Sequence, residues 1–121
     1  MGNSIMLVDD AQVVLLKLSR ILTNAGYNIV TEATNGAEAV EKYKQYYPDL
    51  VIMDIIMPDM KGIDAVKEII KFDPDARIIM CTNLAKKTTV IDAILAGARN
   101  YILKPFNPQK VIDVVSVVIN S

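Results

Sequence analysis

The stretch LVIMD at residues 50–54 places four consecutive apolar residues directly before an aspartate. A similar stretch, IMLVDD at residues 5–10, places four apolar residues before two aspartates. Apolar runs without polar alternation are typical of strands buried on both faces, as in parallel sheets covered by helices. We therefore predict two inner strands of a parallel sheet, each followed directly by acidic residues.

Working outward from these strands, we predict three more at residues 28–33, 77–82 and 100–104. After each strand, apolar residues recur three or four positions apart, which is the spacing of a helix with one buried face. The predicted apolar faces comprise Val14, Leu15, Leu18, Ile21, Leu22 and Ala25 in the first helix, Val40, Tyr43 and Tyr47 in the second, Ile63, Val66, Ile69 and Ile70 in the third, Ile91, Ile94 and Leu95 in the fourth, and Val111, Ile112, Val115, Val118 and Ile119 in the fifth.

Several predicted helices carry recognisable signals at their ends. Gly26 follows the first helix, where glycine commonly terminates helical structure. Asn35, with Glu38 three residues later, resembles a capping box that opens the second helix. Asn107 followed by Pro108 is typical of a helix start and predicts the beginning of the last helix.

Five strands that alternate with five helices predict an α/β fold with a parallel sheet. We expect the flavodoxin-like, doubly wound (βα)5 arrangement, with sheet order 2-1-3-4-5 and helices on both faces. The 121 residues fit one compact domain, and we predict a single domain over residues 1–121. A composition of 52% hydrophobic and 22% charged residues supports a sizeable core and argues against disorder.

The overall charge and composition narrow the classes of partner. Thirteen basic and fourteen acidic residues give a net charge of −1, which argues against nucleic acid or an anionic membrane as the main partner. No apolar run approaches the roughly 20 residues of a membrane span, and the first residues show no secretory signal. The one cysteine, Cys81, cannot form an intrachain disulfide, so we expect a reduced, cytoplasmic setting.

Polar residues gather at the predicted strand ends. Asp9 and Asp10 follow the first strand, Asp54 follows the third, Thr82 ends the fourth and Lys104 ends the fifth. In open α/β sheets ligands bind beyond the carboxyl ends of the strands, so these five side chains should converge at one edge. The joint placement predicts a functional site more strongly than any single residue does.

The charge of this predicted edge indicates a metal site. Three carboxylates in a partly enclosed pocket repel one another, and Lys104 neutralises only one of them. Histidine is absent and Cys81 reads as core, so the remaining ligands are oxygens, which favour Mg²⁺ or Mn²⁺ over zinc. A carboxylate beside such a cation is suited to act as a nucleophile toward a phosphoryl group. Taken alone, Asp10 has the simpler interpretation of a cap for the first helix.

The chain resembles the CheY-like receiver domains of two-component signalling over residues 5–119. The motifs that carry the resemblance are LVDD at residues 7–10, ATNGAEA at 33–39, DIIMPDMKG at 54–62, Thr82, AGA at 96–98 and KPF at 104–106. The resemblance implies that Asp54 is the phosphoacceptor and that Asp10 is a direct metal ligand. It further implies that Asp9 acts on the metal through water and that the backbone carbonyl of Ile56 completes the protein ligands.

The resemblance also assigns the residues that would respond to phosphorylation. Lys104 would pair with phosphoryl oxygens, and its peptide bond to Pro105 would be cis. Thr82 would form a hydrogen bond to the phosphoryl group, and Tyr101 would change rotamer when Thr82 moves inward. The surface formed by the fourth helix, fifth strand and fifth helix would then bind a partner.

The function implied by this resemblance is a phosphorylation switch, a signalling protein that catalyses its own phosphorylation and dephosphorylation at Asp54. The phosphoryl donor would be a histidine kinase or a small molecule such as acetyl phosphate, with Mg²⁺ or Mn²⁺ bound. Chemotaxis is the expected system, with the flagellar motor switch as the effector, a phosphatase as a further partner and a monomeric state. The alternative is a receiver of another two-component pathway, or a fragment of a longer regulator.

Three positions depart from the pattern of the family or affect its chemistry. Asn83 replaces a residue that is usually small, and its side chain would narrow the entrance to Asp54 or contact the phosphoryl group. Ile56 and Leu84 occupy positions that influence hydrolysis, and neither side chain can orient an attacking water. We therefore predict slow self-dephosphorylation.

Other functional classes fit the residues less well. A flavodoxin-like FMN-binding protein needs a phosphate loop after the first strand, where this chain has two acids. A phosphatase of the haloacid dehalogenase type needs a second aspartate two residues after its nucleophile, where this chain has Ile56. An interaction module with a silent site would not require the intact set of acids, Thr82 and Lys104.

Overall fold

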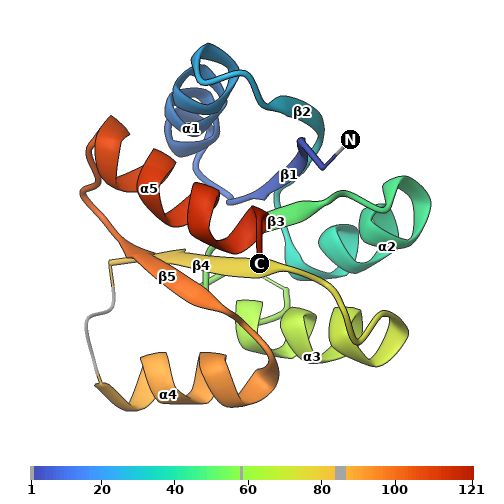
Figure 1. Cartoon of the computed structure of the whole chain (residues 1–121). Helices are drawn as coiled ribbons and strands as arrows, with labels where there is room; N and C mark the ends of the chain where they lie inside the picture. The colour runs from blue at the N-terminus through green and yellow to red at the C-terminus, as the bar shows by residue number, and fades with distance from the viewer. Residues whose placement is uncertain (1, 58, 84–86) are drawn as a thin grey trace.

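The structure, a computed structural model, describes residues 2–57, 59–83 and 87–121. Within these residues, five strands alternate with five helices, as predicted (Figure 1). The strands are β1 (Ser4–Val8), β2 (Asn28–Ala33), β3 (Leu50–Met53), β4 (Ile78–Thr82) and β5 (Asn100–Leu103). The helices are α1 (Gln12–Asn24), α2 (Gly36–Tyr46), α3 (Gly62–Phe72), α4 (Lys87–Ala96) and α5 (Pro108–Ile119).

All five strands form one parallel sheet in the order β2-β1-β3-β4-β5, which confirms the predicted flavodoxin-like topology. Helices α1 and α5 pack together on one face, and α2, α3 and α4 cover the other (Figure 1). None of the described helices has both the length and the apolar character needed to cross a membrane.

The surroundings of the central strands explain why their apolar residues do not alternate with polar ones. In β1, Met6 and Val8 pack toward α2 and α3, whereas Ile5 and Leu7 pack toward α1 and α5. All four side chains are buried because both faces of the sheet are covered. The residues of β3 divide in the same way between the two cores. Burial on both faces therefore required apolar residues at every position.

The predicted helix-end signals are present in the structure. The Asn35 side chain accepts the Glu38 N–H at 2.8 Å, as in a capping box. The Glu38 carboxylate accepts the N–H of Thr34, one residue before the predicted partner. Asn107 caps α5 through the N–H of Lys110 at 2.8 Å. Gly26 has a φ of +97°, the left-handed region that ends a helix readily.

The predicted apolar face of α4 is wrong. Ile91 and Ile94 are each 45% exposed and Leu95 is 80% exposed, whereas Ala93 is buried. Apolar residues surround most of this helix, so their spacing does not identify the side that meets the sheet. The structure thus leaves large apolar side chains of α4 in solvent.

Smaller differences occur at other helices. Tyr47 is exposed and lies beyond the end of α2, with a left-handed φ of +47°, so it does not continue the face formed by Tyr43. Ala25 is exposed because it caps the end of α1. In α5, Val114 is buried although it was not predicted, whereas the predicted Ile112 is only partly buried. These differences arise at helix ends and edges, where periodicity is a weak guide.

Candidate functional site

Register within the parallel sheet brings the polar residues at the strand ends to one level. Val8 of β1 pairs with Met53 of β3, and the N–H of Asp54 donates to the Val8 carbonyl at 2.9 Å. Asp9 and Asp54 therefore leave neighbouring strands side by side. At the ends of β4 and β5, the N–H of Lys104 donates to the Thr82 carbonyl at 2.9 Å.

Three carboxylates form a cluster at this edge. One oxygen from each of Asp9, Asp10 and Asp54 lies within 4.8 Å of the others. Asp9 is 2% exposed and Asp54 8% exposed, whereas Asp10 is open to solvent. Carboxylates at this spacing are a donor set of hard oxygens, which fits a divalent cation such as Mg²⁺ or Mn²⁺.

Asp9, and not Asp10, is the acid that contacts the start of α1. The Asp9 Oδ1 atom accepts the N–H of Ala11 at 2.9 Å. The residue at the N-cap of α1 is Ala11, and no side chain caps this helix end. The alternative interpretation of Asp10 as a helix cap is therefore wrong. The Asp10 carboxylate lies in the cluster and makes no capping contact with α1.

Lys104 lies between the two buried acids. Its Nζ atom is 2.8 Å from Asp9 Oδ2 and 3.4 Å from Asp54 Oδ2. The Lys104–Pro105 peptide bond is cis, as expected. Burial lowers the pKa of the Lys104 ammonium, but the hydrogen bond to Asp9 and the charge of Asp54 outweigh this effect and raise the pKa above its ordinary value. Lys104 therefore stays charged at neutral pH.

The surroundings of Asp54 disfavour the ionised form of its carboxyl group. Burial is the largest influence and raises the pKa of its carboxyl group, and the charge of Asp9 acts in the same direction. Lys104 and a hydrogen bond from the Ile56 N–H act against this rise without cancelling it. The Lys104 ammonium thus does not offset burial and the charge of Asp9, and a bound cation would stabilise the ionised form of Asp54.

The loop after β3 packs tightly on Asp54. The N–H of Gly62 donates to the Ile55 carbonyl at 2.6 Å and closes the loop. A Cβ atom at Gly62 would overlap the Asp54 carbonyl oxygen and lie 2.8 Å from the Ile55 Cα. Glycine is therefore required here by close backbone approach. Ile56, within the loop, has a side chain that is 56% exposed.

Family membership follows from comparison with known proteins. Residues 5–116 match the family model of the response regulator receiver domain. The chain belongs to the receiver domain family. This result favours the resemblance over the flavin-binding and phosphatase alternatives, and it confirms the expected two-component class.

The receiver is of the CheY type found in chemotaxis. It is 52% identical to the chemotaxis protein CheY of Thermotoga maritima over 118 residues, covering 98% of both chains. It is 48% identical to CheY of Bacillus subtilis over 120 residues, covering 99% of this chain and 100% of that one. The structure of a CheX–CheY–BeF3–Mg²⁺ complex from Borrelia burgdorferi matches with a TM-score of 0.91 and 41% identity, over 94% of this chain and 87% of that chain.

The structure also places most of the remaining predicted residues of the receiver. Thr82 is buried at the end of β4, and Asn83 beside it is exposed. Tyr101 is exposed on β5, where it pairs with Met80 in the sheet. Leu84 lies outside the described residues, so its predicted influence on hydrolysis stays a prediction.

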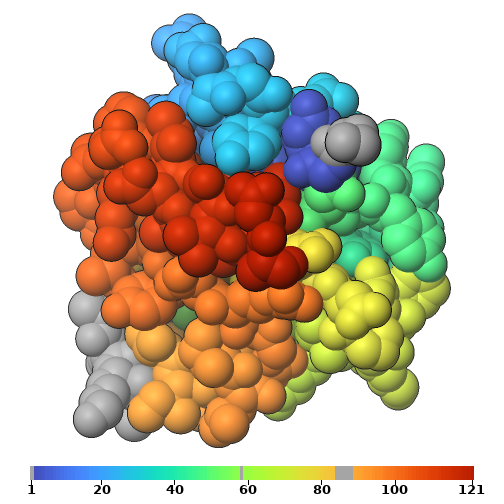
Figure 2. All heavy atoms as spheres, viewed as in Figure 1, coloured from blue at the N-terminus to red at the C-terminus, as the bar shows by residue number. Residues whose placement is uncertain are grey.

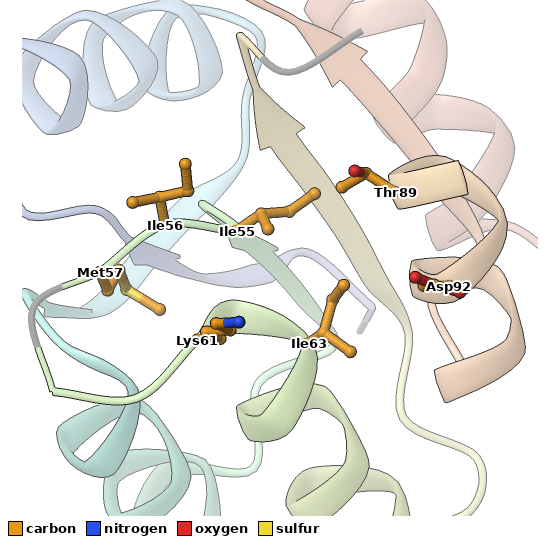
Figure 3. A pocket seen from close by; sticks show the side chains of 7 residues that line it. All are labelled: Ile55, Ile56, Met57, Lys61, Ile63, Thr89 and Asp92. Atoms are coloured by element: carbon orange, nitrogen blue, oxygen red, sulfur yellow. The ribbon is translucent and has the colours of Figure 1, made fainter. Parts of the chain in front are cut away.

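A cavity of about 440 Å³ adjoins the loop that follows Asp54 in this receiver. Its walls come from the β3–α3 loop and the start of α3 on one side and from α4 on the other, which face each other in Figure 3. Ile55, Ile56 and Ile63 supply apolar surface, and Lys61 and Asp92 supply charge. The side chain of Ile56 is therefore accessible from solvent next to Asp54.

Sequence reasoning missed one residue of this region. Asp59, in the same loop, accepts hydrogen bonds from the N–H groups of Gly36 and Ala37. Its partners lie 23 and 22 positions earlier in the chain, so no local pattern reveals them. An acid between Met57 and Gly62 with no assigned role was the available signal.

Proposed function

We propose that this receiver is a phosphorylation switch in which Asp54 accepts a phosphoryl group in a Mg²⁺-dependent reaction. The observation that carries the proposal is the cluster of three carboxylate oxygens within 4.8 Å, with the Lys104 ammonium beside it. The donor is a histidine kinase or a small molecule such as acetyl phosphate. The protein is a signalling component that catalyses its own modification.

The proposed metal ligands are Asp10, Asp54 and the backbone carbonyl of Ile56, with Asp9 acting through water. Mg²⁺ is the expected ion, and Mn²⁺ would substitute for it because both take oxygen ligands. When bound, the cation would neutralise the acids and stabilise negative charge on the transferring phosphoryl group. The burial of Asp9 and Asp54 supports this assignment, since buried charges need compensation.

In the proposed reaction, a carboxylate oxygen of Asp54 attacks the phosphorus of the donor. A new P–O bond forms, the bond from phosphorus to the leaving group breaks, and the leaving group keeps the electron pair. The product is an acyl phosphate. Lys104 already contacts Asp54 and would pair with a phosphoryl oxygen, while Thr82 would donate a hydrogen bond to another.

The proposed output follows from Thr82 and Tyr101. Movement of Thr82 toward the phosphoryl group would let Tyr101 turn inward from its exposed position. Both residues adjoin the surface formed by α4, β5 and α5. Figure 2 shows these three elements, in orange and red, on the side that faces the viewer. The exposed apolar side chains of Ile91, Ile94, Leu95 and Leu103 make this surface suitable for a protein partner.

The proposed partners are those of a chemotaxis pathway. A histidine kinase supplies the phosphoryl group, and the flagellar motor switch binds the phosphorylated form. A phosphatase is a further proposed partner, because Ile56 cannot orient a water for rapid self-hydrolysis. We also propose a monomeric, single-domain state over residues 1–121 in the cytoplasm. Service in another two-component pathway, or within a longer regulator, is the alternative.

The proposal is tested by incubating the protein with acetyl phosphate and Mg²⁺ and measuring intact mass. We expect the mass to increase by one phosphoryl group, and EDTA should prevent the increase. Asp54→Asn, which keeps the size of the side chain but removes the nucleophile, should show no increase. A wild-type mass that stays constant with donor and Mg²⁺, or an equal gain in Asp54→Asn, would contradict the proposal.

A further inference from the structure

The side chain of Asp59 joins the loop after Asp54 to the start of α2. Its Oδ1 atom accepts the N–H of Gly36 at 3.0 Å, and its Oδ2 atom accepts the N–H of Ala37 at 3.1 Å. These are the first two residues of α2, whose N–H groups have no acceptor within the helix. One carboxylate therefore satisfies two helix donors and connects them to a distant loop.

A second contact holds the same two segments together. A Cβ atom at Gly36 would lie 2.7 Å from the Met60 Cβ and 2.9 Å from the Met60 carbonyl oxygen. The start of α2 thus lies against the backbone of the residue that follows Asp59. Gly36 allows this close approach because it has no side chain.

The other end of the loop is fixed independently. The Gly62 N–H donates to the Ile55 carbonyl at 2.6 Å, which anchors the end of the loop beside Asp54. Ile56, whose carbonyl is a proposed metal ligand, lies between this anchor and the contact made by Asp59. A backbone segment held at two points has less freedom than one held at a single point, so its carbonyl loses less entropy on binding a cation.

We propose that Asp59 is a positioning residue of the metal site, which holds the Ile56 carbonyl in place by binding the N-terminus of α2. This inference rests on the proposed function, because it assumes that a divalent cation binds at the acid cluster. The coupling between cation binding and the hydrogen bonds of Asp59 is reciprocal. Cation binding should therefore also stabilise the hydrogen bonds of Asp59 to Gly36 and Ala37. Asp59 itself touches neither the cation nor the phosphoryl group.

The competing interpretation is that Asp59 serves only as a cap for α2. The chain offers a matched control, because Asn35 caps the same helix end through the Glu38 N–H at 2.8 Å. Asn35 reaches this N–H from the residue just before the helix, and none of its hydrogen bonds in the described structure goes to the loop. Asn35→Ala should therefore weaken the start of α2 without freeing Ile56.

The test is the dissociation constant for Mg²⁺, measured by calorimetry at neutral pH for the wild type, Asp59→Ala, Asp59→Asn and Asn35→Ala. We expect Asp59→Ala to weaken binding about tenfold, as for other residues that orient metal ligands. Asp59→Asn keeps one acceptor oxygen and should be intermediate, and Asn35→Ala should bind as the wild type does. Urea unfolding of each variant checks that the folded state is retained.

Hydrogen exchange of the Gly36 and Ala37 amides gives a second readout. Mg²⁺ should slow their exchange in the wild type and in Asn35→Ala, and should have no such effect in Asp59→Ala. Equal Mg²⁺ affinity in Asp59→Ala and the wild type, or an equal loss in Asn35→Ala and Asp59→Ala, would overturn the inference while leaving the proposed function intact. A wild type that binds no Mg²⁺ would overturn both.

Discussion

At the scale of single residues, Ile56 combines an exposed side chain with a backbone carbonyl that we assign to the metal. Its side chain is 56% exposed next to Asp54, so substitution should change chemistry at the site without disturbing the core. We predict that Ile56→Asn shortens the lifetime of phosphorylated Asp54 several-fold, because an amide can orient a water for attack. Intact mass, followed after removal of the donor, measures this lifetime. An unchanged lifetime would contradict the role assigned to Ile56.

The fold lowers the reactivity of the Cys81 thiol. Burial raises the pKa of its thiol to about 12, with Lys104 acting against the rise and Asp9 and Asp54 adding to it. At pH 8 the thiolate fraction falls on the order of 10³-fold below that of an exposed cysteine with a pKa of about 8.5. We predict that iodoacetamide alkylates the native protein far more slowly than the urea-unfolded protein. Comparable rates, measured by mass, would show that Cys81 is accessible.

At the scale of elements, the β3–α3 loop depends on Gly62, the first residue of α3. A Cβ atom there would overlap the Asp54 carbonyl oxygen, so the loop must shift to accept it. We predict that Gly62→Ala lowers the free energy of unfolding by about 1–3 kcal/mol and slows phosphorylation by acetyl phosphate. Urea unfolding and the time course of intact mass measure the two effects.

Gly26→Ala is a matched control for this prediction. Gly26 has a φ of +97°, which strains any other residue, but a Cβ atom there has nothing within 4 Å. Gly26→Ala should therefore lower stability by about 1 kcal/mol and leave the rate of phosphorylation unchanged. If both variants slowed phosphorylation equally, the effect of Gly62 would reflect general destabilisation only.

The elements also show what the sequence could predict. Strands β1 and β3 were evident because burial on both faces demands apolar residues at every position. The inward face of α4 was not evident, because small residues, Ala93 and Ala96, pack against the core while larger apolar residues of that helix are exposed. The contact of Asp59 with Gly36 was also hidden, since it depends on how two separated segments pack. The strand-end acids were predicted correctly as a cluster because parallel topology alone brings them together.

At the scale of the whole molecule, the face formed by α4, β5 and α5 lies beside the acid cluster but outside it. Leu95 is 80% exposed on this face, so a polar substitution removes little packing. We predict that Leu95→Ser changes the free energy of unfolding by less than about 0.5 kcal/mol and leaves phosphorylation unchanged. It should weaken binding of the phosphorylated protein to its proposed partner, the flagellar motor switch, measured by calorimetry. Unchanged affinity would indicate that the partner binds elsewhere.

The central claim is that the molecule converges its strand-end acids so that Asp54, and no neighbouring acid, forms an acyl phosphate. Reduction with borohydride tests this directly, because it converts an aspartyl phosphate into homoserine that peptide mass spectrometry can locate. After treatment with acetyl phosphate and Mg²⁺, we predict homoserine at residue 54 alone. Homoserine at Asp9 or Asp10, or its absence from a protein that has gained phosphoryl mass, would contradict the account.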